Sequence, residues 1–177
     1  MPVIDVARST LLVIDFQARL VLAIEDGAAA VANARRLVHA AAMLDVPALF
    51  TEQNPKGLGP TVPDLAPDEA RVFRKMTFDA SRTPGFDERL TEGHALILAG
   101  WEAHVCVLQT ALGLVVKGWR VYVVGDAVGS RRAENKDAAL RRMAANGVEI
   151  VTTEMVVFEW LGSAANPRFK DAVALIK

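Results

Sequence analysis

The sequence predicts an α/β protein whose parallel strands form the middle layer of a three-layer sandwich. Short apolar runs alternate along the chain with longer amphipathic stretches. Parallel strands need crossover connections, which are usually helices and are almost always right-handed. The apolar runs are also rich in branched residues, as expected for strands that are buried on both faces. We therefore expect one sheet that is covered by helices on both sides.

The first half of the chain contains three of the expected strands. The run from Ser9 to Asp15 is apolar and closes on an acid, which is typical of a buried strand. Apolar residues recur at helical spacing from Ile24 to Leu44, and Val46 to Thr51 follows as a second strand. Residues 52–70 are rich in proline and glycine, so we expect a long loop that acts as a lid, a subunit contact or a plain surface loop. Val72 to Lys75 is a brief third strand.

The second half continues the alternation. A short helix is expected near 85–92, before the most continuous apolar run at 95–100, which predicts a central strand. Helical spacing resumes at 105–117, and a strand at 120–126 precedes a helix over about 135–145. A last short strand at 148–152 and two C-terminal helical segments complete the pattern. We expect residues 1–177 to form a single domain.

The composition disfavours several classes of protein. The chain is 52% hydrophobic and 23% charged, which is a globular profile, and its net charge is -1. A balanced charge leaves no surplus of positive charge for binding nucleic acid or anionic membranes. The longest uncharged run, 105–116, is shorter than the roughly 18–20 apolar residues that span a bilayer, and the N-terminus lacks the pattern of a secretory signal. We therefore expect a cytoplasmic protein without membrane or nucleic-acid partners.

Three reactive side chains follow the predicted strands. Asp15 ends the first strand, Lys75 ends the third, and Cys106 lies in the first turn of the helix after the fourth. Ligands of parallel α/β sheets bind beyond the carboxyl ends of the strands, so we expect these side chains to converge. A cation and a helix N-terminus both lower the pKa of a thiol and favour the reactive thiolate. The alternative is a buried, inert Cys106 with an acid and a lysine in ordinary structural roles.

Together, the three residues could perform acyl transfer that ends in hydrolysis. Lys75 would stabilise the thiolate of Cys106, and Asp15 would act as general base and then as general acid. Backbone N–H groups from Glu102 to Cys106 would hold the oxyanion that forms when the thiolate attacks a carbonyl. His104 precedes Cys106 by two helical positions and would point away from it, so we expect a structural role for His104.

Residues that flank the proposed catalytic groups are candidates for the walls of a substrate pocket. They are Phe16, Gln17, Phe78, Trp101 and Glu102. The three aromatic residues could equally be ordinary core side chains. An acid at position 102 is expected to repel anionic substrates or to bind an amine or amide.

Four segments resemble signature segments of the isochorismatase-like cysteine hydrolases. They are 12–17 (LVIDFQ), 73–80 (FRKMTFDA), 99–110 (AGWEAHVCVLQT) and 123–127 (VVGDA). In order and spacing the resemblance covers about residues 8–175, and the cysteine segment is its most specific part. Residues 51–61 and 166–170 are most similar to the isochorismatase domain-containing proteins within that family.

The resemblance implies a Rossmann-like three-layer α/β/α sandwich with a central, mainly parallel sheet. It also implies an Asp15, Lys75 and Cys106 triad, with the Glu102 and Cys106 N–H groups as the oxyanion hole. A non-proline cis peptide bond would fall at Trp101–Glu102. Nicotinamidases of the family bind a metal through His and Asp residues after the second strand, whereas residues 51–61 contain neither. We therefore expect no metal and no cofactor, and a homo-oligomer by resemblance.

The sequence thus predicts a metal-independent cysteine hydrolase that cleaves a small amide or related C–N substrate through a thioester on Cys106. Two alternatives remain open. Asp15 could catalyse vinyl-ether hydrolysis as an acid, as in isochorismatase, without Cys106 as the nucleophile. The fold could instead serve a non-catalytic, oligomeric protein that binds a ligand or senses redox state through its thiol.

Overall fold

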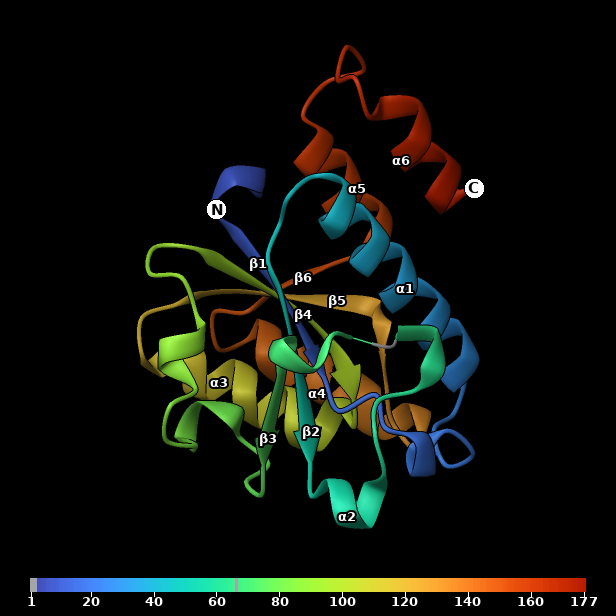
Figure 1. Ribbon diagram of the computed structural model, residues 1–177. Helices are drawn as coiled ribbons and strands as arrows, with labels where there is room; N and C mark the ends of the chain where they lie inside the picture. Colours follow the sequence, from blue (N-terminus) through green and yellow to red (C-terminus); the bar gives the residue numbers. More distant parts are fainter. Residues whose placement is uncertain (1–2, 66) are drawn as a thin grey trace.

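The computed structural model describes residues 3–65 and 67–177, and its strands form one six-stranded sheet in which all five strand pairs are parallel (Figure 1). The strands are β1 (Ser9–Ile14), β2 (Ala48–Gln53), β3 (Val72–Lys75), β4 (Ala95–Trp101), β5 (Arg120–Gly129) and β6 (Glu149–Val151). Their spatial order is β3-β2-β1-β4-β5-β6. The order therefore reverses between β1 and β4, and a ligand crevice is expected at the carboxyl ends of these two strands.

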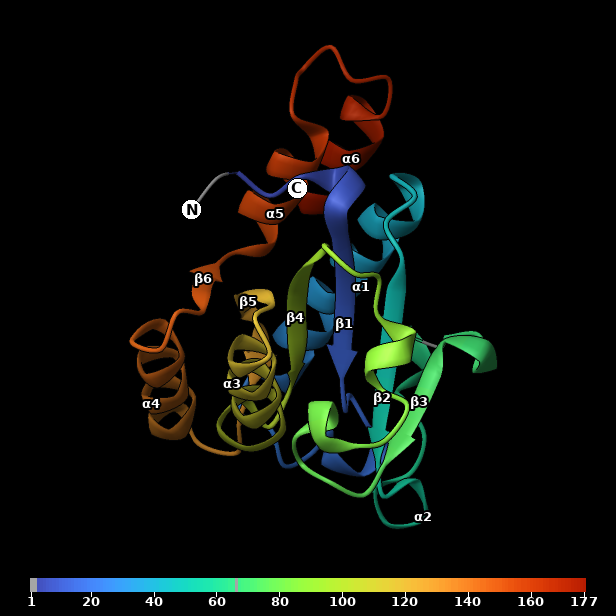
Figure 2. The same ribbon diagram turned by 90° about the vertical axis from the view of Figure 1, so that its left-hand side faces the viewer.

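Helices cover both faces of the sheet, which confirms the predicted α/β sandwich (Figures 1 and 2). One face carries α1 (Gly27–Met43), α5 (Thr153–Leu161) and α6 (Phe169–Ile176), and the other carries α3 (Leu108–Val116) and α4 (Ala133–Ala144). The short α2 (Pro55–Leu58) lies near the carboxyl ends of β2 and β3 (Figure 2). The core consists of two hydrophobic clusters, one between each helical layer and the sheet.

Three segments differ from the sequence-based expectations. The helix expected near 85–92 is only a 3-10 turn at Asp87–Arg89, because Gly85 and Gly93 adopt positive φ angles of 81° and 78° and interrupt the segment at both ends. The segment 52–70 contains the end of β2, α2 and two 3-10 turns rather than a continuous loop. The helix expected at 105–117 begins earlier, with a π-helical turn at Ala103–Val107 before α3.

The long uncharged run at 105–116 lies within this π-helical turn and α3, which pack against the sheet. No helix in the described part of the chain is long and apolar enough to cross a membrane.

Candidate active site

A buried ion pair joins two of the three predicted catalytic residues. The Lys75 Nζ atom lies 2.6 Å from an Asp15 carboxylate oxygen, and both side chains are almost fully excluded from solvent. The second carboxylate oxygen of Asp15 accepts a hydrogen bond of 2.6 Å from the Thr51 hydroxyl. Lys75 also donates to the carbonyl oxygens of Thr77 and Phe78, over 3.2 Å and 3.4 Å. These hydrogen bonds offset the cost of burying two charges, which is otherwise several kcal/mol per ion.

The ends of three strands bring this pair together. Thr51 is the register partner of Ile14 in β1, so its hydroxyl lies beside the residue that follows the strand. Asp15 then turns the chain with a φ of 53°, a left-handed conformation that Asp tolerates better than most residues. Lys75 ends β3, the strand on the far side of β2. The convergence expected from topology is therefore present in the structure.

Cys106 lies on a π-helical turn that packs tightly against the central strands. The N–H of Val107 bonds to the carbonyl oxygen of Glu102, five residues earlier, over 3.3 Å. Such π-turns are rare and occur frequently at functional sites. Gly100 permits the close packing, since a Cβ atom there would lie 2.7 Å from the backbone oxygen of Ile14 and 2.8 Å from a methyl group of Val107. The thiol is consequently held in place beside the end of β1, with 8% of the residue exposed.

The environment of Cys106 favours the neutral thiol. Burial raises the pKa of the Cys106 thiol well above its usual range, and the negative charge of Asp15 raises it further. A hydrogen bond to Asp15 and the charge of Glu102 act in the same direction, whereas Lys75 lowers the pKa by a smaller amount. The raised pKa runs against the expectation of a thiolate stabilised by Lys75. The physical reason is the burial of the thiol first and the neighbouring charge of Asp15 second, which together outweigh Lys75.

A cavity of about 470 Å³ opens onto the thiol and the carboxylate. Its lining consists of Asp15, Leu20, Ala23, Gln53, Leu58, Phe78, Trp101, Glu102, Val105, Cys106 and Arg131. Three of the predicted wall residues are thus in place, namely Phe78, Trp101 and Glu102. Apolar side chains dominate the lining, which is typical of a site for a small molecule.

Phe16 and Gln17 do not line the cavity. Phe16 packs behind it, with its ring centroid 4.9 Å from that of Trp101. The buried Gln17 amide donates to the carbonyl oxygens of Gln53 and Gly59 and accepts from the Gln53 N–H, all within 3.0 Å. Gln17 therefore fixes the segment after β2, which in turn places Gln53 and Leu58 in the cavity wall. The segment 52–70 supplies part of the site.

The peptide bond between Trp101 and Glu102 is trans, so the expected cis bond is absent. The chain instead turns from β4 into the π-helical turn through the backbone of Glu102, whose φ and ψ are -29° and 104°. This turn is held by the Glu102 carbonyl oxygen, which accepts from the N–H groups of Val105 and Val107. The corner is thus made by the φ and ψ angles of Glu102 together with these two hydrogen bonds.

The Glu102 carboxylate forms an ion pair at the mouth of the cavity. The Nε atom of Arg131 contacts one carboxylate oxygen, and the backbone N–H of Arg131 donates to the other over 3.2 Å. His104 Nδ1 lies 3.4 Å from Glu102 and 3.0 Å from the Ser130 hydroxyl, which agrees with the structural role expected for this histidine. The acid that was expected to repel anionic substrates is therefore neutralised.

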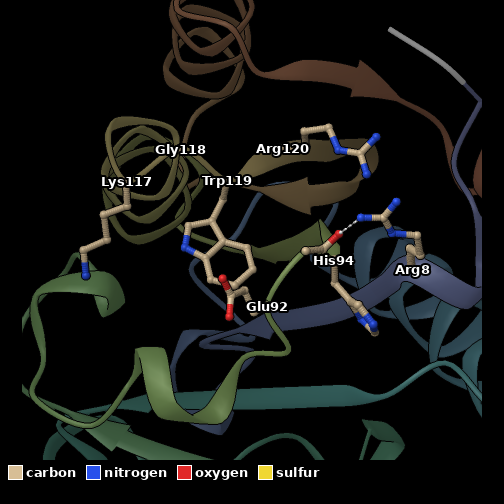
Figure 3. Close-up of a pocket in the computed structure, with 8 residues that line it drawn as sticks. Arg8, Glu92, His94, Lys117, Gly118, Trp119 and Arg120 are labelled. Atoms are coloured by element: carbon tan, nitrogen blue, oxygen red, sulfur yellow. Dashed lines mark hydrogen bonds between the residues drawn. The ribbon is translucent and has the colours of Figure 1, made fainter.

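A second cavity, of about 680 Å³, lies at the opposite edge of the sheet, before the first residues of β1, β4 and β5 (Figure 3). Trp119 and Arg120 line it, and Arg8 donates to the Gly93 carbonyl oxygen over 3.2 Å. Its lining contains His94 but no Cys, Ser or Thr that could act as a nucleophile. This second cavity is therefore a weaker candidate for an active site than the cavity at Cys106, which holds the single thiol of the chain.

Within the described residues, no group of three or more His, Cys, Asp or Glu side chains is placed to hold a metal ion. A metal-independent site stays a prediction.

Sequence reasoning missed several residues that contribute to the site, among them Thr51, Arg131 and Leu58. Thr51 could have been found, because it ends the strand predicted at 46–51, next to the first strand, and carries a hydroxyl. Arg131 had no local signal, since acidic neighbours made it look like part of a solvated surface. Leu58 enters the cavity through the folded path of 52–70, which local sequence patterns do not predict.

Comparisons with known proteins agree across most of the chain. A family model for the isochorismatase domain matches residues 9–155. Isochorismatase domain-containing protein 2 from Xenopus laevis is 40% identical over 149 residues, which cover 82% of this chain and 72% of that protein.

Solved structures show the same fold. The MAR1 ribonuclease from Caenorhabditis elegans matches with a TM-score of 0.93 and 36% identity, over 99% of this chain and 92% of that one. The YcaC gene product from Escherichia coli, described as an octameric hydrolase of unknown specificity, matches with a TM-score of 0.86 and 24% identity, over 99% and 88%. At that identity the second match shows the fold alone.

Proposed function

Because this chain belongs to the isochorismatase family, we propose that it is a metal-independent cysteine hydrolase that cleaves a small amide or related C–N bond. One observation carries the proposal. A fully hydrogen-bonded Asp15–Lys75 pair lies beside Cys106, the single cysteine of the chain, in a cavity with mostly apolar walls. A buried ion pair rarely stabilises a fold more than apolar side chains of similar volume would, so its position beside a thiol favours a chemical role.

The first half of the reaction forms a thioester. Asp15 takes the proton of the Cys106 thiol while the sulfur attacks the substrate carbonyl carbon. The Lys75 ammonium group, 2.6 Å from Asp15, holds the carboxylate in place for this transfer. The N–H groups of Glu102 and Cys106 hold the oxyanion, and Asp15 returns the proton to the departing nitrogen as the C–N bond breaks. This order of events suits a thiol that is neutral at rest.

The second half hydrolyses the thioester. Asp15 removes a proton from water, the resulting oxygen nucleophile attacks the thioester carbon, and the C–S bond breaks. The proton then returns to the Cys106 sulfur and a carboxylic acid leaves. Each cycle consumes one water and releases one amine or ammonia.

The test is a set of small primary amides with Cys106→Ala and Cys106→Ser as variants. We expect wild-type turnover with an acyl adduct on Cys106 that is detectable by intact-protein mass spectrometry after acid quenching, and loss of both in the variants. Retained turnover in Cys106→Ala would support vinyl-ether hydrolysis by Asp15 instead. Absence of turnover and of any adduct across the amides would contradict the proposal.

One solved structure with the same fold is named a ribonuclease, so RNA is a necessary control substrate. The net charge of this chain is -1, and Arg131, the basic residue of the cavity lining, is paired with a carboxylate, as is the buried Lys75 next to Asp15. Phosphate backbones are bound mainly by surplus positive charge. These observations favour a small molecule over RNA.

We also propose that the protein assembles into a homo-oligomer. The complete exposure of the Leu22 side chain beside the half-exposed Val21 supports this. Light scattering on purified protein would test it, and a monomeric mass at micromolar concentration would contradict it.

A further inference from the structure

Arg131 occupies a distinctive position at the cavity that holds Cys106. It follows β5 by two residues, and Glu102 follows β4 by one. Because Trp101 and Gly129 are register partners in these strands, the two charged residues emerge side by side. The Arg131 side chain is 60% exposed and lines the cavity, whereas that of Glu102 is only 10% exposed. Glu102 is therefore the fixed partner, and Arg131 is the part that a ligand can reach.

Glu102 contacts the parts of Arg131 that lie nearest to its backbone. The ion pair runs through Nε, and the backbone N–H of Arg131 is bound to the same carboxylate. His104 supports the arrangement, because its Nδ1 lies within 3.4 Å of both Glu102 and the Ser130 hydroxyl. Among the described residues, the two terminal nitrogens of the guanidinium group donate no hydrogen bond. Those nitrogens form the fork that binds carboxylates with two parallel hydrogen bonds.

The charges around the cavity indicate which kind of ligand the terminal guanidinium nitrogens of Arg131 would bind. The ammonium group of Lys75 is buried and already paired with Asp15, so it cannot reach an incoming anion. Glu102 is compensated by Arg131 and does not leave a net negative charge at the entrance. Phe78 and Trp101 provide apolar walls in the same cavity as Arg131 and the thiol. The arrangement suits a molecule with an apolar middle, a C–N bond at one end and an anion at the other.

We propose that Arg131, positioned by Glu102, binds a carboxylate of the substrate, so that the enzyme acts on a small amide that also carries a carboxylate. This inference rests on the proposed hydrolase function and specifies its substrate class. It reverses the sequence-based expectation that Glu102 disfavours anions. Arg131 contacts the substrate carboxylate and thereby determines specificity, whereas Glu102 acts through Arg131 as a positioning residue.

A matched pair of probes tests the charge preference without knowledge of the substrate. N-Iodoacetylglycine and N-iodoacetylglycinamide share one reactive carbon and differ only in a distal carboxylate or carboxamide. In each, the Cys106 sulfur displaces iodide, a C–S bond forms, and the thiol proton passes to base. The rate ratio, carboxylate probe over amide probe, is measured by mass spectrometry. Cys106 is the only cysteine, so the label is unambiguous.

We expect a ratio of about ten for the wild type, the size of one charge-assisted hydrogen bond at a partly exposed site. Arg131→Met should bring the ratio below one, because Glu102 is then uncompensated. The double variant Arg131→Met/Glu102→Gln should return it to about one. Arg132→Met is the matched control, since Arg132 contacts Glu134 at 3.8 Å outside the cavity, and it should keep the wild-type ratio.

A wild-type ratio at or below one, or the same ratio in wild type and Arg131→Met, would overturn the proposal. If neither probe labels Cys106, the nucleophile of the proposed function has failed, and recognition is then decided by the unreactive analogues. N-Acetylglycine should raise the melting temperature of the wild type more than N-acetylglycinamide does. Equal shifts, or the same difference in Arg131→Met, would reject Arg131 as a carboxylate site.

Discussion

Replacing Asp15 by Asn is expected to make Cys106 react faster with a simple alkylating agent while it abolishes turnover. Asn keeps the shape of the side chain and an oxygen that can accept the Thr51 hydrogen bond. It removes the negative charge that raises the pKa of the Cys106 thiol and weakens the hydrogen bond that acts in the same direction. The Lys75 ammonium also loses its counterion and is left to stabilise the thiolate.

The size of the effect follows from two opposing terms. Removal of one nearby charge lowers a pKa by ~1–3 units, so a fall of about two units increases the thiolate fraction about 100-fold near neutral pH. A less basic thiolate is a weaker nucleophile, and a Brønsted slope of ~0.4–0.5 reduces that gain by a factor of about eight. We therefore expect alkylation at pH 8 to be about tenfold faster. Turnover should fall by a factor of ~10²–10⁴, because the general base is lost.

Iodoacetamide kinetics between pH 7 and 10, followed by intact mass, measure the first effect. The double variant Asp15→Asn/Lys75→Met is the control, because it removes both charges and should alkylate more slowly than Asp15→Asn. A buried, unpaired Lys75 destabilises a protein by ~3–5 kcal/mol, so each variant is first shown to be folded by circular dichroism at the assay temperature. Alkylation of Asp15→Asn at or below the wild-type rate would refute the reasoning.

Three further substitutions test separate parts of the structure. Gly100→Ala should lower the free energy of unfolding by about 3 kcal/mol, since the added methyl meets backbone within 2.7 Å, and a urea titration would show it. Thr51→Val should cost about 2 kcal/mol in the same titration, because Asp15 loses a charge-assisted hydrogen bond, and should also reduce kcat. The pKa of the Cys106 thiol is raised in the folded protein, whereas the unfolded chain has the ordinary thiol pKa of ~8.5. Above that pH the unfolded chain loses the thiol proton first, so the free energy of unfolding falls as pH rises. The wild type should therefore lose about 1.4 kcal/mol per pH unit between about pH 9 and 10, and Cys106→Ser should lose markedly less.

Most of the fold could be predicted from the sequence because its strands are local patterns. The runs that became β1 and β4 are apolar, short and rich in branched residues, and both are buried along their whole length. The segment after β2 was harder, because its path depends on the distant side chain of Gln17. The π-helical turn before α3 was also missed, since it depends on how closely Gly100 lets the turn approach β1.

Which reactive groups meet could be predicted from the sequence alone. Asp15 and Lys75 each follow or end a strand, and Cys106 begins the next helix, so parallel topology alone brings them to one edge of the sheet. Their chemical state depends on the tertiary fold, because a pKa is set by burial and by distances across neighbouring strands. The fold buries the Cys106 thiol beside Asp15, which raises the thiol pKa, pairs Lys75 with Asp15, and pairs Glu102 with Arg131.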